Sequence, residues 1–158
     1  SLPALEDTRP HLLFVAHGIP LSRVRKGDPY PDQVATTANA VVERLGGSLP
    51  WSLAFQSRVG PARWLEPDVG AETRRLAGQG VRALIVQPLS FTSENLETLD
   101  DLDRDLAETA REARITLFRR GAAPGTHPAY MDGLRDLALE LARKRDWCDL
   151  GTTENHDV

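Results

Sequence analysis

The sequence predicts an α/β fold in which a four-stranded parallel sheet lies between two layers of helices. Four short apolar runs, each about the length of a buried strand, alternate with stretches whose apolar residues keep the spacing of an amphipathic helix. Strands that alternate with helices are joined by right-handed crossovers, which makes the strands parallel and places helices on both faces of the sheet.

The four expected strands are short and apolar. They cover residues 12–16, 51–55, 81–87 and 115–118, and the third of these runs is the most apolar. Continuous apolar runs of this length are typical of strands that are buried on both faces.

Four helices are expected to follow the strands, at residues 32–45, 68–79, 93–113 and 128–144. Gly46 and Gly80 follow the first two helices and are typical helix stops, and Asp68 can cap the second helix. The expected core stripe of the last helix consists of Met131, Leu134, Leu137, Ala138 and Leu141.

Two connections, residues 19–31 and 56–67, are rich in proline and glycine and are expected to be long loops. With 158 residues, of which 41% are hydrophobic and 27% charged, the chain matches one globular domain. We expect that domain at residues 11–146, between a flexible segment at 1–10 and a tail at 147–158.

The composition excludes several classes of protein. A net charge of −4 without a large Lys/Arg cluster argues against nucleic-acid binding. The single cysteine, Cys148, excludes an internal disulfide and fits a reducing compartment. No apolar run approaches the roughly 18 residues of a membrane helix, and the N-terminus lacks the layout of a signal peptide. We therefore expect a soluble, cytoplasmic protein.

The third expected helix carries a row of carboxylates. Ser93 or Thr92 can serve as its N-cap. Like charges four residues apart cost about 0.2–0.5 kcal/mol per pair, so the row must face either water or a cation. A solvated face and a row of oxygen ligands for a divalent metal are both open. At about 100° per residue, the expected core side is Leu96, Leu99, Leu102, Leu106, Ala110 and Ala113, and the expected acidic side is Glu94, Glu97, Asp101, Asp105, Glu108 and Glu112.

Histidines and aromatic residues gather near the carboxyl ends of the expected strands, where ligands bind in open α/β sheets. His17 closes the first strand, and functional and structural roles are both open for it; His11 and His127 are expected at capping or surface positions. Tyr30, Trp64 and Phe91 fall in loops at the same edge, where they could form an apolar face for a flat ligand or could pack the loops. A basic histidine, carboxylates and an aromatic rim together suggest metal chemistry on a large flat molecule.

Four sequence motifs resemble those of the ferrochelatase family and occur in the same order. They are Ala16-His17-Gly18-Ile19-Pro20, Gly27-Asp28-Pro29-Tyr30-Pro31, Phe55-Gln56-Ser57-Arg58-Val59-Gly60-Pro61 with Trp64-Leu65, and Phe91-Thr92-Ser93-Glu94-Asn95-Leu96-Glu97-Thr98-Leu99. The resemblance covers about residues 12–141 and corresponds to the second, C-terminal half of a usual ferrochelatase. It implies a flavodoxin-like (chelatase-like) α/β/α sandwich and the insertion of Fe²⁺ into a porphyrin, protoporphyrin IX or coproporphyrin III, in haem biosynthesis.

The resemblance also implies roles for individual residues. His17 and Glu97 match the catalytic histidine and glutamate, which abstract pyrrole protons or bind metal. Asp101 and Asp105 match further acidic positions, so that the implied metal ligands are His17, Glu97, Asp101 and Asp105. The implied substrate-binding residues are Tyr30, Ser57, Trp64, Phe91 and Asn95.

The chain departs from the family pattern in two ways. Asn95 stands where the family usually has histidine, and the half that completes the porphyrin cleft is missing, so a second half, as an N-terminal domain or a second copy of the chain, is expected as a partner. A chelatase, a non-catalytic metal- or tetrapyrrole-binding domain and a structural fragment are therefore all open. Fe²⁺ is expected as the substrate metal, and the single cysteine argues against an iron–sulfur cluster.

Overall fold

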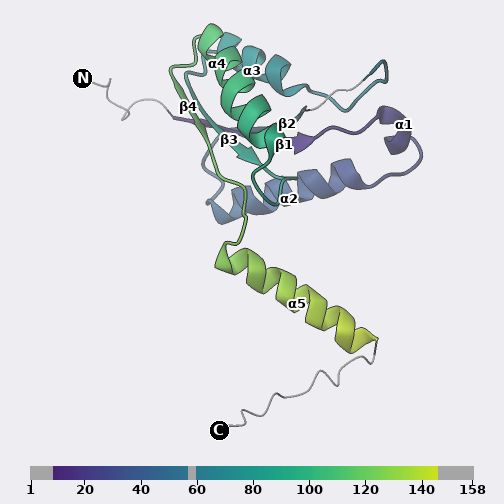
Figure 1. Ribbon diagram of the computed structural model, residues 1–158. Helices are drawn as coiled ribbons and strands as arrows, with labels where there is room; N and C mark the ends of the chain where they lie inside the picture. The colour runs from purple at the N-terminus through teal and green to yellow at the C-terminus, as the bar shows by residue number, and fades with distance from the viewer. Residues whose placement is uncertain (1–8, 57–59, 146–158) are drawn as a thin grey trace. The chain divides into compact units, whose positions relative to one another are not determined.

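The computed structural model describes residues 9–56 and 60–145 (Figure 1). Ser57 and the expected tail at 147–158 lie outside the described residues, as does most of the expected segment 1–10. The chain divides into two compact units, Ser1–Ala123 and Pro124–Val158, which are treated separately below.

The first unit contains a sheet of four strands, all of them parallel. The strands are β1 (His11–His17), β2 (Trp51–Gln56), β3 (Ala83–Pro88) and β4 (Leu117–Arg120), in the order β2-β1-β3-β4. The expected α/β fold with a four-stranded parallel sheet is therefore confirmed, and β1 and β3 are its central strands.

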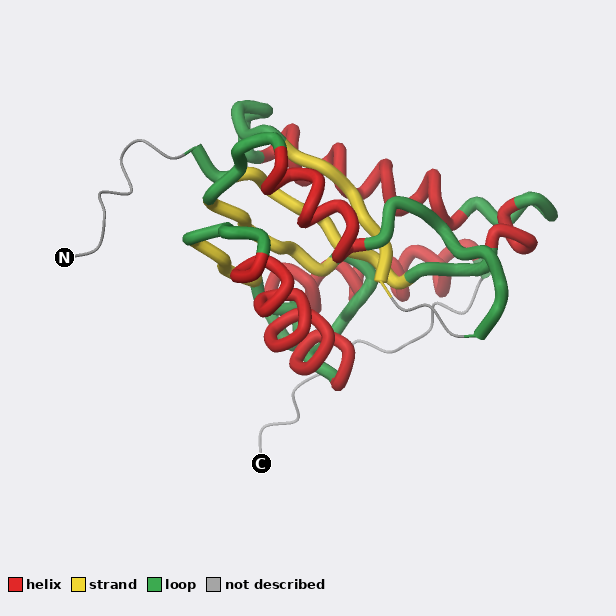
Figure 2. Tube along the Cα trace, turned by 90° about the horizontal axis from the view of Figure 1, so that it is seen from above, coloured by secondary structure: helices red, strands yellow, loops and turns green. Residues whose placement is uncertain are grey.

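Helices cover both faces of this sheet (Figures 1 and 2). The helix α2 (Tyr30–Arg44) lies on one face, and α3 (Val69–Gly78) lies on the other together with the π-helix η2 (Glu97–Leu106) and its continuation α4 (Ala107–Glu112). Asp68 caps α3 as expected, because its side chain accepts a hydrogen bond from the Ala71 N–H at 3.0 Å.

The side chains of β1 alternate between these two layers of helices. Leu13 and Val15 belong to the core cluster that includes Leu102 of η2, whereas Leu12 and Phe14 pack with Ala38 of α2. Alternation along a strand assigns odd-numbered residues of β1 to the η2 face. His17, two residues after Val15, is thereby directed to that face.

The connection after β1 is more ordered than the sequence indicates. A short helix, α1 (Leu21–Val24), lies within the expected loop, and α2 begins at Tyr30 rather than Asp32. Proline is tolerated in the first turn of a helix because the N–H that it lacks has no intrahelical partner there. Pro31 therefore lies inside α2, and Tyr30 belongs to its first turn.

The expected core side of the acidic helix is partly wrong. Leu96 and Leu99 are 76% and 55% exposed, and the buried residues of η2 are Thr98, Leu102 and Leu106. A π-helix forms i→i+5 hydrogen bonds and turns through less than 100° per residue. Positions four apart therefore share its inner face, and the face drawn for an α-helix is rotated away from the observed one.

The second unit contains one described helix, α5 (Pro128–Lys144), which matches the expected span. The structure of this unit buries no residue of the helix, so its expected core stripe stays a prediction. Apolar periodicity predicts an apolar face but does not say what covers it. Within the described residues, no helix of either unit has the length and apolar character that crossing a membrane requires.

Candidate functional site

The site is built around a contact between His17 and Glu97, which lie 80 positions apart in the chain. The Nδ1 atom of His17 lies 2.9 Å from Oε2 of Glu97. His17 ends β1 and Glu97 begins η2, so the carboxyl edges of the two central strands bring them together. Their side chains are 43% and 39% exposed, so both face solvent in part.

The pairing determines where His17 carries its proton. An ionised carboxylate can only accept hydrogen bonds, so a neutral His17 beside it must carry hydrogen on Nδ1. The lone pair then lies on Nε2, on the other side of the ring. The arrangement offers a nitrogen that can accept a proton or bind a metal, held in orientation by a carboxylate.

Three neighbouring residues fix the position of His17. Ser90 Oγ accepts a hydrogen bond from the His17 N–H at 2.7 Å, and the Tyr30 hydroxyl donates to the His17 carbonyl at 2.8 Å. The ring of Phe91 meets the imidazole edge to face, with centroids 6.5 Å apart. Burial raises the pKa of Tyr30, which keeps its hydroxyl protonated as a donor.

The aromatic residues expected at this edge make contacts with the protein itself. Phe91 is buried beside His17, and Tyr30 is half-buried with its hydroxyl engaged. Trp64 forms an isolated antiparallel bridge with Pro20, and its Nε1 is buried without a hydrogen-bond partner among the described residues. These aromatic residues support the loops around His17.

Gln56 is a site residue that the sequence prediction missed. It pairs with His17 in the β1–β2 register, and its Nε2 donates to Glu97 Oε2 at 3.3 Å. Gln56 is buried, and within the described chain its Oε1 has no partner. The available signal was its place directly after the expected strand at 51–55 and two residues after Ala54, which puts it on the same face as Ala54.

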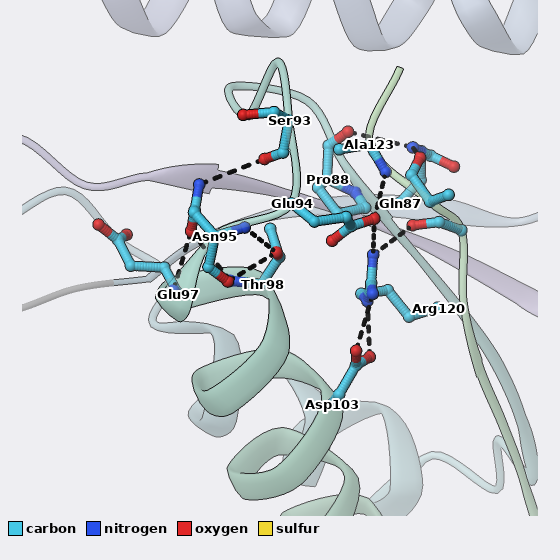
Figure 3. A network of polar contacts seen from close by, with 12 residues as sticks. Gln87, Pro88, Ser93, Glu94, Asn95, Glu97, Thr98, Asp103, Arg120 and Ala123 are labelled. Carbon is cyan, nitrogen blue, oxygen red and sulfur yellow. Dashed lines mark hydrogen bonds and ion pairs between the residues drawn. The ribbon is translucent and has the colours of Figure 1, made fainter. Parts of the chain in front are cut away.

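Asn95 caps the π-helix. Its Oδ1 accepts hydrogen bonds from the N–H groups of Glu97 and Thr98 at 2.9 and 3.2 Å, and its Nδ2 donates to the Ser93 carbonyl at 3.3 Å (Figure 3). The expected N-cap, Ser93 or Thr92, is therefore wrong. Asparagine is a favourable N-cap because its short side chain reaches these orphan donors. Asn95 thus holds the backbone N–H of Glu97 directly.

Glu94 does not lie with the other carboxylates of the expected acidic side; it pairs with Arg120 at the end of β4 (Figure 3). Arg120 Nη1 donates to Glu94 Oε1 at 2.9 Å, and Arg120 also contacts both oxygens of Asp103, at 2.6 and 2.7 Å. Glu94 accepts a further hydrogen bond from the Ala123 N–H at 2.8 Å. The hydrogen bond from Arg120 is the main cause that lowers the pKa of Glu94 to about 2.

The rest of the acidic row begins at Glu97. The pKa of Asp101 is raised, first by burial and then by the charges of Glu97, Asp100 and Asp105. Asp105 also contacts Arg104 Nε at 3.1 Å. In the part of the chain that the structure describes, no three His, Cys, Asp or Glu side chains are close enough to hold a metal ion. Of the four expected metal ligands, His17 and Glu97 are in contact.

The remaining histidines differ in their surroundings. His11, expected at a capping or surface position, is instead buried in β1, where its Nε2 lies 3.0 Å from Ser52 Oγ. Burial lowers the pKa of His11. The surface position expected for His127 is confirmed, since it is exposed and precedes α5. His11 contacts the neighbouring strand through Nε2 and lies outside the His17 site.

Comparison with known proteins determines the family. The family model described as ferrochelatase matches residues 2–142, which is most of the chain. The chain belongs to the ferrochelatase family. The similar proteins include a ferrochelatase from Synechococcus elongatus, 45% identical over 139 residues, and one from Trichodesmium erythraeum, 42% identical over 142 residues.

These ferrochelatases are much longer than the chain. The alignments cover 85% and 88% of this chain but only 36% and 37% of the two relatives. A solved structure of comparable length is a cobalamin (vitamin B12) biosynthesis CbiX protein from Marinobacter aquaeolei. It superposes with a TM-score of 0.58 at 21% identity and covers 85% of this chain and 99% of its own. That likeness establishes a shared chelatase-like fold.

Proposed function

We propose that this chain takes part in the insertion of Fe²⁺ into a porphyrin, protoporphyrin IX or coproporphyrin III, with His17 and Glu97 as the reacting residues. The observation that carries the proposal is the 2.9 Å contact between His17 Nδ1 and Glu97 Oε2 at the carboxyl edge of the two central strands. Membership in the ferrochelatase family supports it.

The chemistry requires an acceptor for protons and ligands for a cation. Two pyrrole N–H protons leave the macrocycle as one divalent metal enters, so charge balances when both protons reach the protein or water. His17 Nε2, the ring nitrogen that does not contact Glu97, can take a proton, and Glu97 can bind the metal as it loses water or receive a proton through His17. Gln56 and Asn95 hold Glu97 for this role.

The acidic residues beyond Glu97 extend the proposed site. Asp101 and Asp105 follow Glu97 at four-residue steps along η2, and after burial the charges of Glu97, Asp100 and Asp105 raise the pKa of Asp101. A raised pKa makes Asp101 a better proton acceptor than an ordinary aspartate at the same pH. We assign Asp101 and Asp105 to the path by which metal enters or protons leave.

We propose that the chain forms one side of the porphyrin cleft and needs a second half to form the other side. The relatives that it matches are nearly three times as long as the aligned segment. An N-terminal domain or a second copy of the chain would cover the other side of the macrocycle.

Metal insertion can be measured directly. The purified chain at micromolar concentration, given porphyrin and Fe²⁺ or Zn²⁺ without oxygen, is expected to form metalloporphyrin faster than a protein-free control, followed by the visible absorption bands. His17→Ala should abolish the increase, and His127→Ala, at an exposed histidine of the second unit, should keep it. Equal rates for wild type, His17→Ala and the protein-free control would rule out catalysis by this chain alone.

A second candidate is a domain that binds metal or tetrapyrrole without turnover. It is favoured by Asn95, whose side chain is occupied in capping η2 where the family usually has a titratable histidine. Such a domain would shift the porphyrin absorbance without forming product. Activity that appears in Asn95→His would identify a chelatase that lost one group, and absence of porphyrin and metal binding would exclude this candidate.

A further inference from the structure

Arg120, the last residue of the edge strand β4, contacts the acidic segment at two places, one before and one after Glu97 in the sequence (Figure 3). Its Nη1 donates to Glu94 Oε1 at 2.9 Å, just before η2. Its Nε and Nη2 donate to the two oxygens of Asp103, within η2, at 2.6 and 2.7 Å. A single side chain thus joins both ends of the segment that carries Glu97.

The donors of Arg120 are almost all used within the protein. A guanidinium has five N–H groups. Those of Arg120 make the three hydrogen bonds to carboxylates and a further one, at 3.1 Å, to the Gly121 carbonyl. The side chain is 11% exposed. Arg120 is therefore placed to hold η2 and the loop before it, rather than to bind an anionic ligand.

The contact with Glu94 reaches Glu97 through the neighbouring residue Asn95. Glu94 is held from a second side by the Ala123 N–H at 2.8 Å. Asn95 Oδ1 accepts the Glu97 N–H at 2.9 Å, and the Asn95 N–H donates to Thr98 Oγ1 at 2.9 Å. A shift of Glu94 would therefore move the cap of η2 and, with it, the backbone of Glu97.

The contact with Asp103 depends on the π-helical form of η2. A π-helix turns through less than 100° per residue, so the direction of Asp103 relative to Glu97 differs from that in an α-helix. In the observed form, Asp103 meets Arg120. Glu97 at the same time lies 2.9 Å from His17. The pair of Arg120 and Asp103 therefore favours the form of η2 that places Glu97 at His17.

We propose that Arg120 is a positioning residue for metal insertion, because its two contacts keep the Glu97 carboxylate at His17. The inference rests on the proposed function, in which His17 and Glu97 react, and adds a residue that touches neither porphyrin nor metal. Weakening the contacts of Arg120 should therefore slow metal insertion without weakening porphyrin binding.

Arg120→Lys keeps the positive charge and removes the planar set of donors. An ammonium group is a point charge and does not reproduce the paired hydrogen bonds that a guanidinium makes to a carboxylate. Misplacing reacting groups by about 1 Å can lower a rate about 100-fold, and lysine keeps part of the contact, so kcat is expected to fall about tenfold. The KM for the porphyrin should change by less than about twofold, because Arg120 does not bind it.

The test measures turnover and, separately, the protonation site on the His17 ring. Turnover of the complete chain is followed with coproporphyrin III and Zn²⁺. The ring is followed by ¹⁵N NMR at about pH 8.5, where histidine is neutral. Beside the Glu97 carboxylate, neutral His17 must carry its hydrogen on Nδ1. Arg120→Lys should change this single form into a mixture of the Nδ1–H and Nε2–H forms.

The matched control is Arg75→Lys. Arg75 makes the same kind of paired contact within α3, from Nε and Nη2 to the two oxygens of Glu72, at 2.7 Å each. This control should keep the wild-type kcat and the wild-type form of His17. Glu94→Gln is a second variant, which keeps Arg120 and weakens its contact with the loop. It should change kcat and the His17 ring in the same direction as Arg120→Lys.

The outcomes separate this inference from the proposed function. Wild-type kcat and a wild-type His17 ring in both Arg120→Lys and Glu94→Gln, with His17→Ala inactive, would overturn the positioning role and leave the proposed function standing. A lower kcat with an unchanged His17 ring, or a higher KM with an unchanged kcat, would also overturn it. If the wild-type chain inserts no metal, the proposed function fails, and an unchanged His17 ring in Arg120→Lys then overturns the inference by itself.

Discussion

Replacing Arg120 by alanine is expected to destabilise the first unit by about 3 kcal/mol. Arg120 is only 11% exposed and makes three charge-assisted hydrogen bonds, two to Asp103 and one to Glu94. Each such bond contributes about 1.5–3 kcal/mol where both partners are buried. Because Glu94 and Asp103 are 36% and 38% exposed and can regain water, about 1 kcal/mol per bond is the appropriate value.

Urea unfolding at pH 7, followed by circular dichroism, gives the free energy of unfolding of Arg120→Ala. The matched control is Arg104→Ala on η2, an exposed residue that pairs with Asp100 and Asp105. Pairs of this kind contribute about 0.3–0.5 kcal/mol each, so the control should lose less than about 1 kcal/mol. An Arg120→Ala protein within about 0.5 kcal/mol of wild type would refute the assigned network.

The ion pair between Glu94 and Arg120 also predicts how the free energy of unfolding changes at acidic pH. The folded pKa of Glu94, about 2, lies below its ordinary value of 4.5. Its ionised form therefore stabilises the fold fully above pH 4.5, and this contribution is lost as pH falls toward 2. After allowance for exposure it amounts to about 1 kcal/mol. Arg120→Ala should lack this part of the acid dependence, and identical pH profiles in the two proteins would contradict the pairing.

Three further predictions concern single residues. Asn95→Ala should lower the free energy of unfolding by about 1 kcal/mol through loss of the cap, with Ser93→Ala unchanged. Leu102→Ala should lower the free energy of unfolding by about 2–5 kcal/mol because Leu102 is fully buried. Leu99→Ala should change it by no more than about 0.5 kcal/mol. Equal losses for the two variants in urea unfolding would contradict the assigned inner face of the π-helix. By NMR, the midpoint of the His11 titration should lie below 6.5, because burial lowers its pKa, and a midpoint above 6.5 would contradict the assignment. The free energy of unfolding should therefore decrease as the pH is lowered below 6.5. His11→Gln should lack this dependence.

The sheet and the place of its carboxyl edge followed from the sequence because strand burial and helix periodicity are local signals. The runs that contain Leu13, Ala54 and Leu84 each supply the apolar side chains that a central parallel strand needs. The meeting of His17 and Glu97 followed in turn, because parallel strands end at the same edge.

The details of η2 could not be predicted in the same way. Leu96 and Leu99 match an α-helical core stripe as well as Leu102 does, and no local propensity separates α from π hydrogen bonding. The roles of Arg120 and Gln56 depend on neighbours 17 to 41 residues away in the chain. Such pairings become visible only when strand order and register are known.

The alternation of side chains along β1 limits where residues could be inserted into or deleted from the chain. His17 faces Glu97 because it has the same parity as Leu13 and Val15. Inserting or deleting a single codon within residues 12–16 would turn His17 toward α2 and exchange the two apolar faces of the strand. Insertions in the turn at Gly46 and Gly47, before β2, would leave this parity untouched. In a library of length variants, functional chains should therefore preserve the residue count of β1 and vary in that turn.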